Sequence, residues 1–385
     1  MTWKEGNAMK TPETSKLFKR VTDQSGVGYY VLKERVCAFQ QGFYFVNNSM
    51  TLDGRYLWFY ATVNPIYYGD KRCVGFIDFL TDELVLCTDV MFDDACPYID
   101  NETGDLYFTC GKTLYKRAPV KEKMAEPVCA VPINGAVITL ATHLTRCTDK
   151  KRFFLDINRA EFGFIQGLLN IETGAFTKWS EGKEAINHGQ INPRNDSLAL
   201  CAIDSYSEIG TGISHRIPCN EKGEYMRLWT VDADGKRTMY PPMHNYATHE
   251  WWSADGKKIY YVNDFGIYRI NIETGVHECA YSCRPNHAFT TKDEQLFVFD
   301  EDVVPDGKWY RGCPARVRFY NARTGKEIVV VEKMPETSDG YHKRYHLDAH
   351  PRFTDNEKYI VFTTTAFSGC DLAIASVEEL RGLTE

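Results

Sequence analysis

The 385-residue sequence has no cysteine pair spaced C-x-x-C, and its thirteen cysteines are odd in number and irregularly placed. A disulfide scaffold or a zinc ribbon is therefore not expected. Cys87, Cys110 and Cys201 instead lie in apolar runs, where a free thiol acts as a small hydrophobic side chain. This usage is typical of a reducing compartment, and we expect a cytoplasmic protein.

Other absences exclude further classes of protein. The segment Met1–Lys10 lacks a basic stretch followed by an apolar one, so no signal peptide is expected. No apolar run reaches about 18 residues, so we expect no transmembrane helix and no membrane partner. Lys and Arg number 45 against 52 Asp and Glu, and the net charge of −7 argues against a nucleic-acid partner. An anionic ligand would therefore need a local cluster of cations or a metal ion.

What the sequence does contain is a repeat. A polar turn followed at once by a short strand of aromatic and β-branched residues occurs seven times. The copies are spaced roughly 40–60 residues apart, as in the blades of a propeller. The turns contain Asp53, Glu102, Asp149, Arg194, Asp255, Asp293 and Asn356.

A second turn, ending in glycine, follows about half a unit later at Gly174, Gly275 and Gly325, with a variant at Gly235. Glycine supplies the positive φ that such hairpins require. Two hairpins per unit give four antiparallel strands. We therefore predict an all-β protein, a seven-bladed β-propeller with four-stranded antiparallel blades.

The propeller is expected to form a single domain over residues 1–385. Residues 1–25 are predicted to be an N-terminal extension, and residues 205–225 a long inserted loop, because the latter segment is polar and contains glycine. A strand near Tyr29–Leu32 is expected to close the ring by completing the blade that contains Asp371–Ser376.

Histidines recur in register with the turns. Only ten histidines are present, and five of them lie six residues before the turn position: His143, His188, His249, His287 and His350. The strand before this turn lines the channel of a propeller, so the five imidazoles should converge on one axis. Converging imidazoles suit a divalent transition metal, or calcium where carboxylates join them. The alternative is that each histidine is structural and bonds a strand in its own blade, but packing alone rarely needs five such side chains around a wet channel.

A second pattern surrounds the last of these histidines. His346, Asp348 and His350 alternate, so on a strand they would face one side. A one-sided His-x-Asp-x-His array is a moderately specific metal-ligand signal.

Five segments of the sequence carry a family resemblance. They are His188-Gly-Gln-Ile-Asn-Pro, Arg227-Leu-Trp, Thr248-His-Glu-Trp-Trp-Ser-Ala-Asp-Gly256, Asn286-His287 and His350-Pro-Arg-Phe. In their order and spacing they resemble the oligogalacturonate lyases, a family of seven-bladed propeller enzymes that degrade short pectin fragments. The resemblance covers most of the chain and is best from His188 onward.

The resemblance implies a metal-dependent β-elimination that gives 4,5-unsaturated uronate products. It implies that His249 is the base, that Arg227 assists it, and that His287 and His350 are metal ligands, with Asp348 and His346 beside them. The family's metal is typically manganese. A cation near the carboxylate and a neutral histidine base suit such chemistry, because a proton next to a carboxylate is very weakly acidic.

The sequence departs from the family pattern at two positions. Asp348 stands where the family has a histidine ligand, and Tyr345 stands where it has a glutamine. A carboxylate favours harder ions, so Mn²⁺ is expected and Ca²⁺ or Mg²⁺ remains possible. The same departure leaves the exact uronide open.

We expect an acidic oligosaccharide as the partner molecule, and a monomer or homodimer. The residues expected to contact this substrate are His143, His188, Arg216, Arg344 and Tyr345. For Arg216 and Arg344 a solvated surface role is an equal alternative. Trp251 and Trp252 could stack on sugar rings, but adjacent strand residues face opposite sides, and packing between blades is favoured for both.

Three other functions differ from this one in the residues that they require. A non-catalytic propeller that binds sugar or protein needs no converging histidines. A propeller attached to a serine hydrolase is excluded because the sequence has no G-x-S-x-G elbow and no second domain of sufficient size. A lyase for another uronide, such as a rhamnose–glucuronate fragment, stays open.

Overall fold

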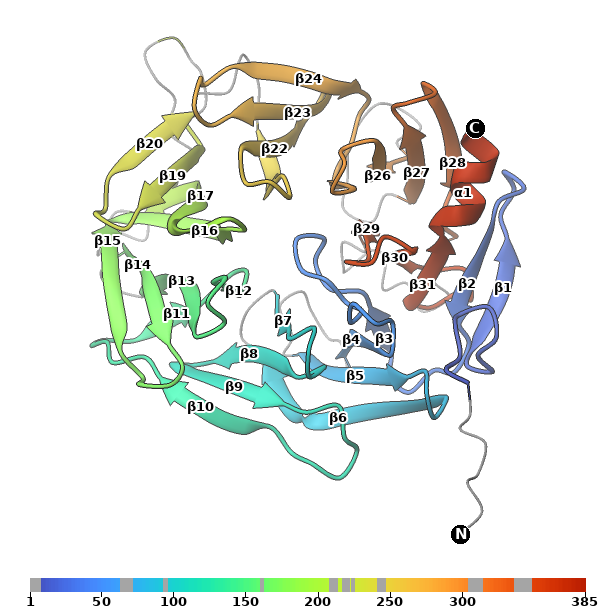
Figure 1. The fold of residues 1–385 in the computed structure, drawn as a ribbon, viewed down its shortest axis with the longest axis horizontal. Helices are drawn as coiled ribbons and strands as arrows, with labels where there is room; N and C mark the ends of the chain where they lie inside the picture. Colours follow the sequence, from blue (N-terminus) through green and yellow to red (C-terminus); the bar gives the residue numbers. More distant parts are fainter. Residues whose placement is uncertain are drawn as a thin grey trace.

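The computed structural model describes residues 8–62, 72–92, 96–159, 163–207, 214–216, 222, 226–240, 247–303, 314–335 and 348–385. For residues 92, 204–207 and 214–216 it describes the backbone alone. The described strands form seven antiparallel sheets arranged as a ring around a central axis (Figure 1). The predicted all-β, seven-bladed propeller is confirmed.

Each blade runs outward from an innermost strand. The first blade consists of β3 (Phe39–Gln41), β4 (Tyr56–Thr62), β5 (Arg72–Asp78) and β6 (Glu83–Phe92). The second consists of β7 (Tyr98–Ile99), β8 (Leu106–Cys110), β9 (Thr113–Arg117) and β10 (Glu126–Ala130). In the third, β11 (Val137–Thr139) and β12 (Thr145–Arg146) both pair with β13 (Arg152–Arg159), followed by β14 (Gly163–Asn170) and β15 (Phe176–Gly182).

The next three blades repeat this order. The fourth consists of β16 (Glu184–Asn192), β17 (Asn195–Ser207), β19 (Leu228–Asp232) and β20 (Arg237–Tyr240), with β18 (Ser214–Arg216) paired to β17. The fifth consists of β21 (Thr248–Trp252), β22 (Lys258–Asn263), β23 (Gly266–Asn271) and β24 (His277–Ser282). The sixth consists of β25 (Ala288–Thr290), β26 (Leu296–Asp302), β27 (Ala315–Asn321) and β28 (Lys326–Val331).

The N-terminal part of the chain closes the ring. The last blade orders β29 (Arg352–Phe353), β30 (Tyr359–Thr364), β31 (Asp371–Ser376), β2 (Gly28–Leu32) and β1 (Phe18–Thr22). Tyr30 and Val31 of β2 pair with Ile374 and Ala373 of β31, so the closing strand expected near residues 29–32 is confirmed. The prediction that residues 1–25 form an extension is wrong for residues 18–22, because β1 adds a fifth strand to this blade.

The loop expected over residues 205–225 is also partly structured, since Ser205–Ser207 pair with Ser214–Arg216. Residues 208–213, 217–221 and 223–225 lie outside the described part. Both predicted turn classes appear where expected: the second class has Gly174, Gly235, Gly275 and Gly325 at φ of 71°, 81°, 69° and 71°.

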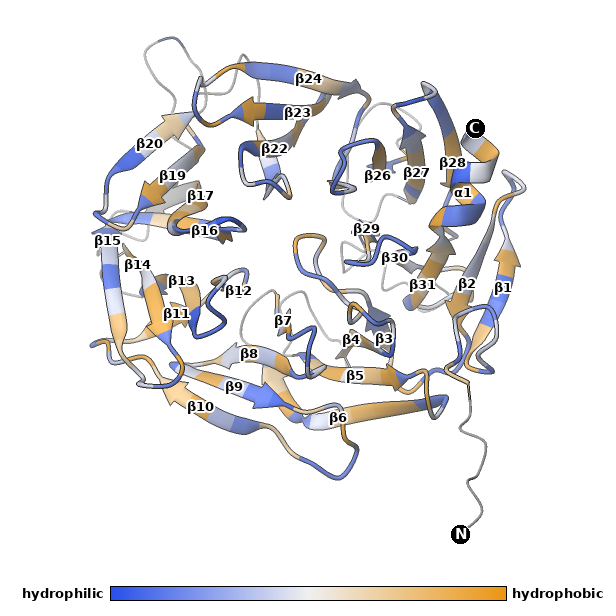
Figure 2. Cartoon of the chain, viewed as in Figure 1, coloured by the Kyte–Doolittle hydropathy of each residue, from blue (hydrophilic) through white to orange (hydrophobic). Residues whose placement is uncertain are grey.

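The core lies between neighbouring blades, because each sheet buries its apolar residues against the next. Figure 2 shows hydrophobic residues concentrated on the strands and hydrophilic ones on many of the turns. Helix α1 (Val377–Thr384) is capped by Ser376, whose side chain accepts from the Glu379 backbone N–H, and it buries Val377 and Leu380 against the last two blades. No helix of the described residues is long and apolar enough to cross a membrane.

Candidate active site

The five histidines lie on or just before the innermost strands of blades three to seven. Their rings follow one another around the axis, with centroid separations of 4.7 Å for His143 and His188 and 6.3 Å for His188 and His249. The next two separations, His249 to His287 and His287 to His350, are 4.0 and 4.3 Å. The convergence predicted from the register is confirmed.

Local backbone geometry turns three of these side chains into the channel. His188, His249 and His350 have φ of 55°, 51° and 45°, a left-handed conformation that is uncommon for residues other than glycine. At His188 and His249 the pairing with the next strand shifts register, as in a β-bulge. Bulges re-aim side chains, and such strained positions cluster at functional sites.

His287, Asp348 and His350 form a group that could hold a metal ion. Each offers one ligand atom, and these atoms lie within 4.8 Å of one another. His350 Nε2 is 3.5 Å from an Asp348 carboxylate oxygen and is buried with no hydrogen-bond partner among the described residues. Two imidazoles and a carboxylate around an orphaned buried nitrogen fit a divalent cation of borderline or hard character, such as Mn²⁺.

This grouping does not arise from strand alternation. Asp348 and His350 precede β29, which begins at Arg352, and the left-handed His350 backbone brings the two side chains together. The inference that the array lies on one face of a strand is therefore wrong, although two of its three members do meet. His346 lies outside the described residues.

A buried carboxylate behind the group orients it. Asp300 on β26 accepts from the backbone N–H groups of His287 at 2.6 Å and His350 at 3.0 Å. Its carboxylate is also 3.2 Å from His287 Nδ1, which leaves Nε2 of that ring for a ligand. Burial, with the Asp348 charge nearby, raises the pKa of Asp300 to about 6.

The third blade has a matching carboxylate. Asp156 lies seven residues after Asp149, as Asp300 lies seven after Asp293. It accepts from the backbone N–H groups of Thr142 at 2.8 Å and Gly189 at 3.0 Å, which flank His143 and His188. Sequence reasoning missed both carboxylates, although an aspartate inside an apolar run at the same repeat position was the available signal.

His249 is held in one orientation. Its Nδ1 contacts the carbonyl oxygen of Asn286, so Nδ1 carries the proton and Nε2 has a lone pair. Burial, together with the neighbouring His287 and His188, holds the pKa of His249 well below its ordinary value. The ring is therefore neutral at pH 7, the form that can accept a proton.

Arg227 belongs to a buried charge network. Its Nη1 donates to Glu250 Oε2 at 2.5 Å, and the other Glu250 oxygen lies 2.7 Å from His188 Nδ1. Burial opposes the charge of Glu250, but Arg227 and His188 hold its pKa well below the ordinary value. Glu250, beside His249 in the sequence, was not singled out from the sequence.

Tyr44 is a further residue that sequence reasoning missed. The connection between β3 and β4 leaves the first blade and reaches toward the axis (Figure 1). The ring of Tyr44 lies 4.7–6.3 Å from all five histidine rings. Burial raises the pKa of its hydroxyl well above the ordinary value. Tyr44 is thus the common packing partner of the histidine cluster.

Of the remaining predicted site residues, the structure describes the side chain of His143 but not those of the others. His143 is buried against Tyr44, and neither ring nitrogen has a hydrogen-bond partner among the described residues. Arg216 lies in β18 without a described side chain, while Arg344 and Tyr345 lie outside the described residues.

The two adjacent tryptophans pack as expected. Trp251 stacks on Tyr260 with ring centroids 5.1 Å apart, and Trp252 Nε1 donates to the carbonyl of Gln190 at 3.1 Å. Both side chains are buried between blades.

Comparison with known proteins points to one family. No family model matches the chain. An oligogalacturonate lyase of Dickeya dadantii (strain 3937) is 22% identical over 231 residues, and this match spans 55% of the length of either protein.

Two solved structures share the fold over nearly the whole chain. An oligogalacturonate lyase in complex with manganese superposes with a TM-score of 0.71 at 19% identity, over 93% of this chain and 96% of its own. The oligogalacturonate lyase of Vibrio parahaemolyticus gives a TM-score of 0.70 at 19% identity with the same coverage. In sequence and in fold, the chain is therefore similar to the oligogalacturonate lyases.

Proposed function

We propose that the protein is a metal-dependent lyase that cleaves uronate-containing oligosaccharides of the oligogalacturonate type by β-elimination. The observation that carries this proposal is the side-by-side arrangement of a neutral histidine and a metal-ligand group. The His249 ring is 4.0 Å from that of His287, which lies within the group formed with Asp348 and His350. The similarity to oligogalacturonate lyases supports the choice of substrate class.

In this proposal His287, Asp348 and His350 hold a divalent cation, Mn²⁺ in the first instance. When bound, the cation supplies positive charge beside the uronate carboxylate and makes the neighbouring C5–H more acidic. His249 Nε2 takes the C5 proton, the C4–C5 double bond forms, and the bond from C4 to the leaving sugar oxygen breaks, with that oxygen taking a proton from water to leave as a hydroxyl.

The other residues hold the reacting groups in position or balance their charge. Arg227 adds a cation near the site and is fixed in place by Glu250, while Asn286 and Asp300 fix the tautomers of His249 and His287. Tyr44 excludes water from the faces of the imidazoles. His143 and His188 are proposed to contact the acidic oligosaccharide, in a cytoplasmic enzyme.

The experiment is a spectroscopic assay for the conjugated unsaturated uronate. Metal-stripped protein is incubated with digalacturonate, trigalacturonate or a rhamnose–glucuronate fragment, before and after addition of Mn²⁺, Mg²⁺ or Ca²⁺. We expect a rise in absorbance with galacturonates that depends on added Mn²⁺. A rise with the rhamnose–glucuronate fragment alone would show that this fragment, and not a galacturonate, is the substrate. No rise with any uronide would support a non-catalytic sugar-binding propeller.

A further inference from the structure

A cavity lies farther along the innermost strands than the histidines. It has a volume of about 240 Å³, and its lining residues, apart from Val46, follow the histidine of their own blade by two to seven positions. Thr145, Gln190, Trp251, Phe289 and Arg352 each lie two residues after a histidine and line it. The cavity is therefore on the turn side of the cluster, away from the histidine rings.

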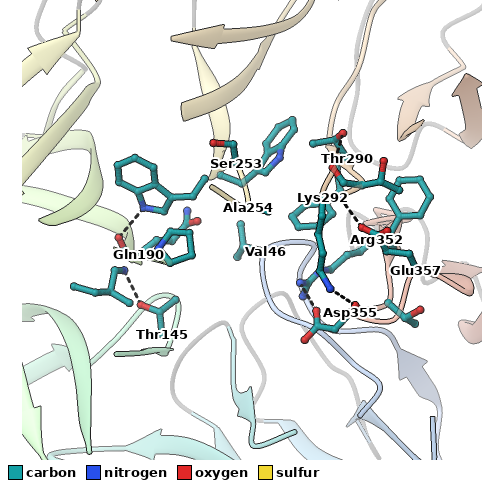
Figure 3. A pocket seen from close by; sticks show the side chains of 18 residues that line it. Val46, Thr145, Gln190, Ser253, Ala254, Thr290, Lys292, Arg352, Asp355 and Glu357 are labelled. Carbon is teal, nitrogen blue, oxygen red and sulfur yellow. Dashed lines mark hydrogen bonds and ion pairs between the residues drawn. The ribbon is translucent and has the colours of Figure 1, made fainter. Parts of the chain in front are cut away.

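The loop of the first blade separates the two sites. Tyr44 contacts all five histidine rings, and Phe45 packs against His249 and His287. The next residue, Val46, lines the cavity and lies at its centre in Figure 3. A molecule in the cavity would touch Val46 without touching the metal-ligand group.

Two residues that line the cavity, Arg352 and Trp251, hold buried hydrogen-bond donors that no described residue accepts. Arg352 Nη2 donates to Asp355 Oδ1 at 3.1 Å, but its Nε and Nη1 are buried with no hydrogen-bond partner among the described residues. Trp251 Nε1 is likewise buried, and no residue in the described part of the chain accepts from it. Both side chains flank Phe289: the guanidinium is 4.6 Å from its ring and the Trp251 ring is 6.0 Å away. Buried donors without acceptors are unfavourable, so the site favours a ligand rich in acceptors.

The nearby acidic groups already have partners. The second Asp355 oxygen accepts from Asn101 at 2.9 Å, and Glu357 accepts from the backbone N–H of Lys292. The Lys292 ammonium also lies in this part of the cavity, donating to the Asp355 carbonyl. Figure 3 shows Arg352, Lys292 and Asp355 together on one side of Val46, with Gln190 and Thr145 on the other.

The shape and walls set the size of the ligand. Trp252 and Phe289 offer aromatic surface, and Ile191 and Pro193 add apolar surface. The volume is below the roughly 300–1,000 Å³ of pockets for drug-sized molecules. It suits one ring with a small polar substituent.

We propose that this cavity is a binding site for a single-ring carboxylate, with the carboxylate on Arg352 and the ring against Phe289 and Trp252. Guanidinium groups match the planar geometry of a carboxylate through two parallel hydrogen bonds. Two sources share this chemistry, a monomeric hexuronate and an aromatic carboxylate. The inference stands apart from the proposed lyase function.

The test uses full-length, metal-stripped protein, so that the histidine site is disabled. Calorimetric titrations are carried out with monomeric galacturonate, with benzoate and with inorganic phosphate, and the tryptophan fluorescence of Trp251 and Trp252 is followed in parallel. We expect saturable one-to-one binding of one of the two carboxylates, the tighter one identifying the source, and at least tenfold weaker binding of phosphate.

Two variants probe the same cavity in different ways. Arg352→Gln should weaken carboxylate binding at least tenfold, and Ala254→Leu, which fills the cavity, should do the same if the first variant folds poorly. Arg381→Gln on the exposed face of α1 is the matched control and should bind as the parent protein does. His287→Ala should leave the binding unchanged.

Three outcomes would overturn the proposal. They are the absence of saturable binding by either carboxylate, unchanged binding in both Arg352→Gln and Ala254→Leu, and loss of binding in His287→Ala. Equal affinity for phosphate would overturn the assignment of a planar carboxylate.

Discussion

Glu250 and Arg227 form an ion pair of 2.5 Å between two almost fully buried side chains. Glu250 uses both oxygens, since the second faces His188 Nδ1. Removing one partner of a buried pair leaves an uncompensated charge and costs about 3–5 kcal/mol of unfolding free energy. We predict a loss of this size for Glu250→Gln, measured by urea unfolding at pH 7.

The same ion pair should make the free energy of unfolding decrease as the pH falls. The folded-state pKa of Glu250 is depressed below its ordinary value of 4.5. The contribution of Glu250 to the free energy of unfolding is therefore fully present above pH 4.5, and it is lost as the pH falls toward the folded-state pKa. Between pH 5.5 and 3.5, the stability difference between the parent protein and Glu250→Gln should narrow by about 1 kcal/mol. A difference that stays constant over this range would contradict the assignment of charge to Glu250.

His249→Gln should remove the proposed base while leaving the metal site intact. General-base catalysis contributes about 10²–10⁴-fold, so we expect turnover to fall by that factor, measured as the rate of unsaturated-uronate formation. Mn²⁺ affinity should not change, because His249 is not among the three ligands. His277→Gln on the outer strand β24 is the control and should keep its activity. Retained turnover in His249→Gln would mean that another group is the base.

Asp300→Asn should weaken metal binding, because Asp300 fixes both the ring and the backbone of His287. Residues that orient metal ligands in this way typically contribute 10–100-fold to affinity, and we predict a loss in that range. The readout is the paramagnetic resonance signal of free Mn²⁺, which disappears on binding.

Asp156→Asn provides the matched control for Asp300. It removes a buried carboxylate at the same repeat position, so both variants lose stability, yet it supports no proposed metal ligand. Its Mn²⁺ affinity should equal that of the parent protein. Equal losses in the two variants would show that Asp300 acts through general destabilisation.

Tyr44 should stabilise the histidine cluster through its ring. Tyr44→Ala leaves a void among five imidazoles, and removal of a large buried side chain typically costs about 3–5 kcal/mol. Tyr44→Phe keeps the ring and should change the melting temperature much less. If Tyr44→Ala melts at the temperature of the parent protein, the cluster does not depend on this contact.

Substitutions that disrupt the closing strand β2 should lower the unfolding free energy strongly. Val31 is fully buried and pairs with Ala373, so proline at this position removes a backbone donor within the sheet. We expect Val31→Pro to lower the unfolding free energy by about 3 kcal/mol or more. Lys121→Pro, in the exposed turn between β9 and β10, is a control for proline itself. A stable Val31→Pro variant would argue against closure through β2.

The repeat and its histidines were predictable because each is a local pattern. A turn such as that at Asp255 and the histidine six residues before it follow from the four-stranded unit, which places equivalent positions on one axis. The closing strand near residues 29–32 was expected only as the element that completes the last blade. The family resemblance then suggested which histidines differ in role.

The rest of the site depends on geometry that the repeat does not encode. Tyr44 reaches the axis because the first blade interrupts its inner strand, and nothing in the local pattern marks that interruption. Asp348 and His350 meet through a left-handed backbone at His350, and not through strand alternation. The sequence around Glu250 is that of an ordinary strand. The residue that stabilises its buried charge, Arg227, lies 23 positions away in the sequence.

The most direct test of the proposed chemistry is the mass of the cleavage products in heavy-oxygen water. The Mn²⁺-loaded protein is incubated with trigalacturonate, and the products are analysed by mass spectrometry. β-Elimination predicts one unsaturated product that is lighter by one water than the hydrolysis product of the same length. No solvent oxygen should enter the products, apart from exchange at the reducing end. Incorporation of heavy oxygen at the cleaved bond would show hydrolysis, and would contradict the assignment of His249 as a base acting on carbon.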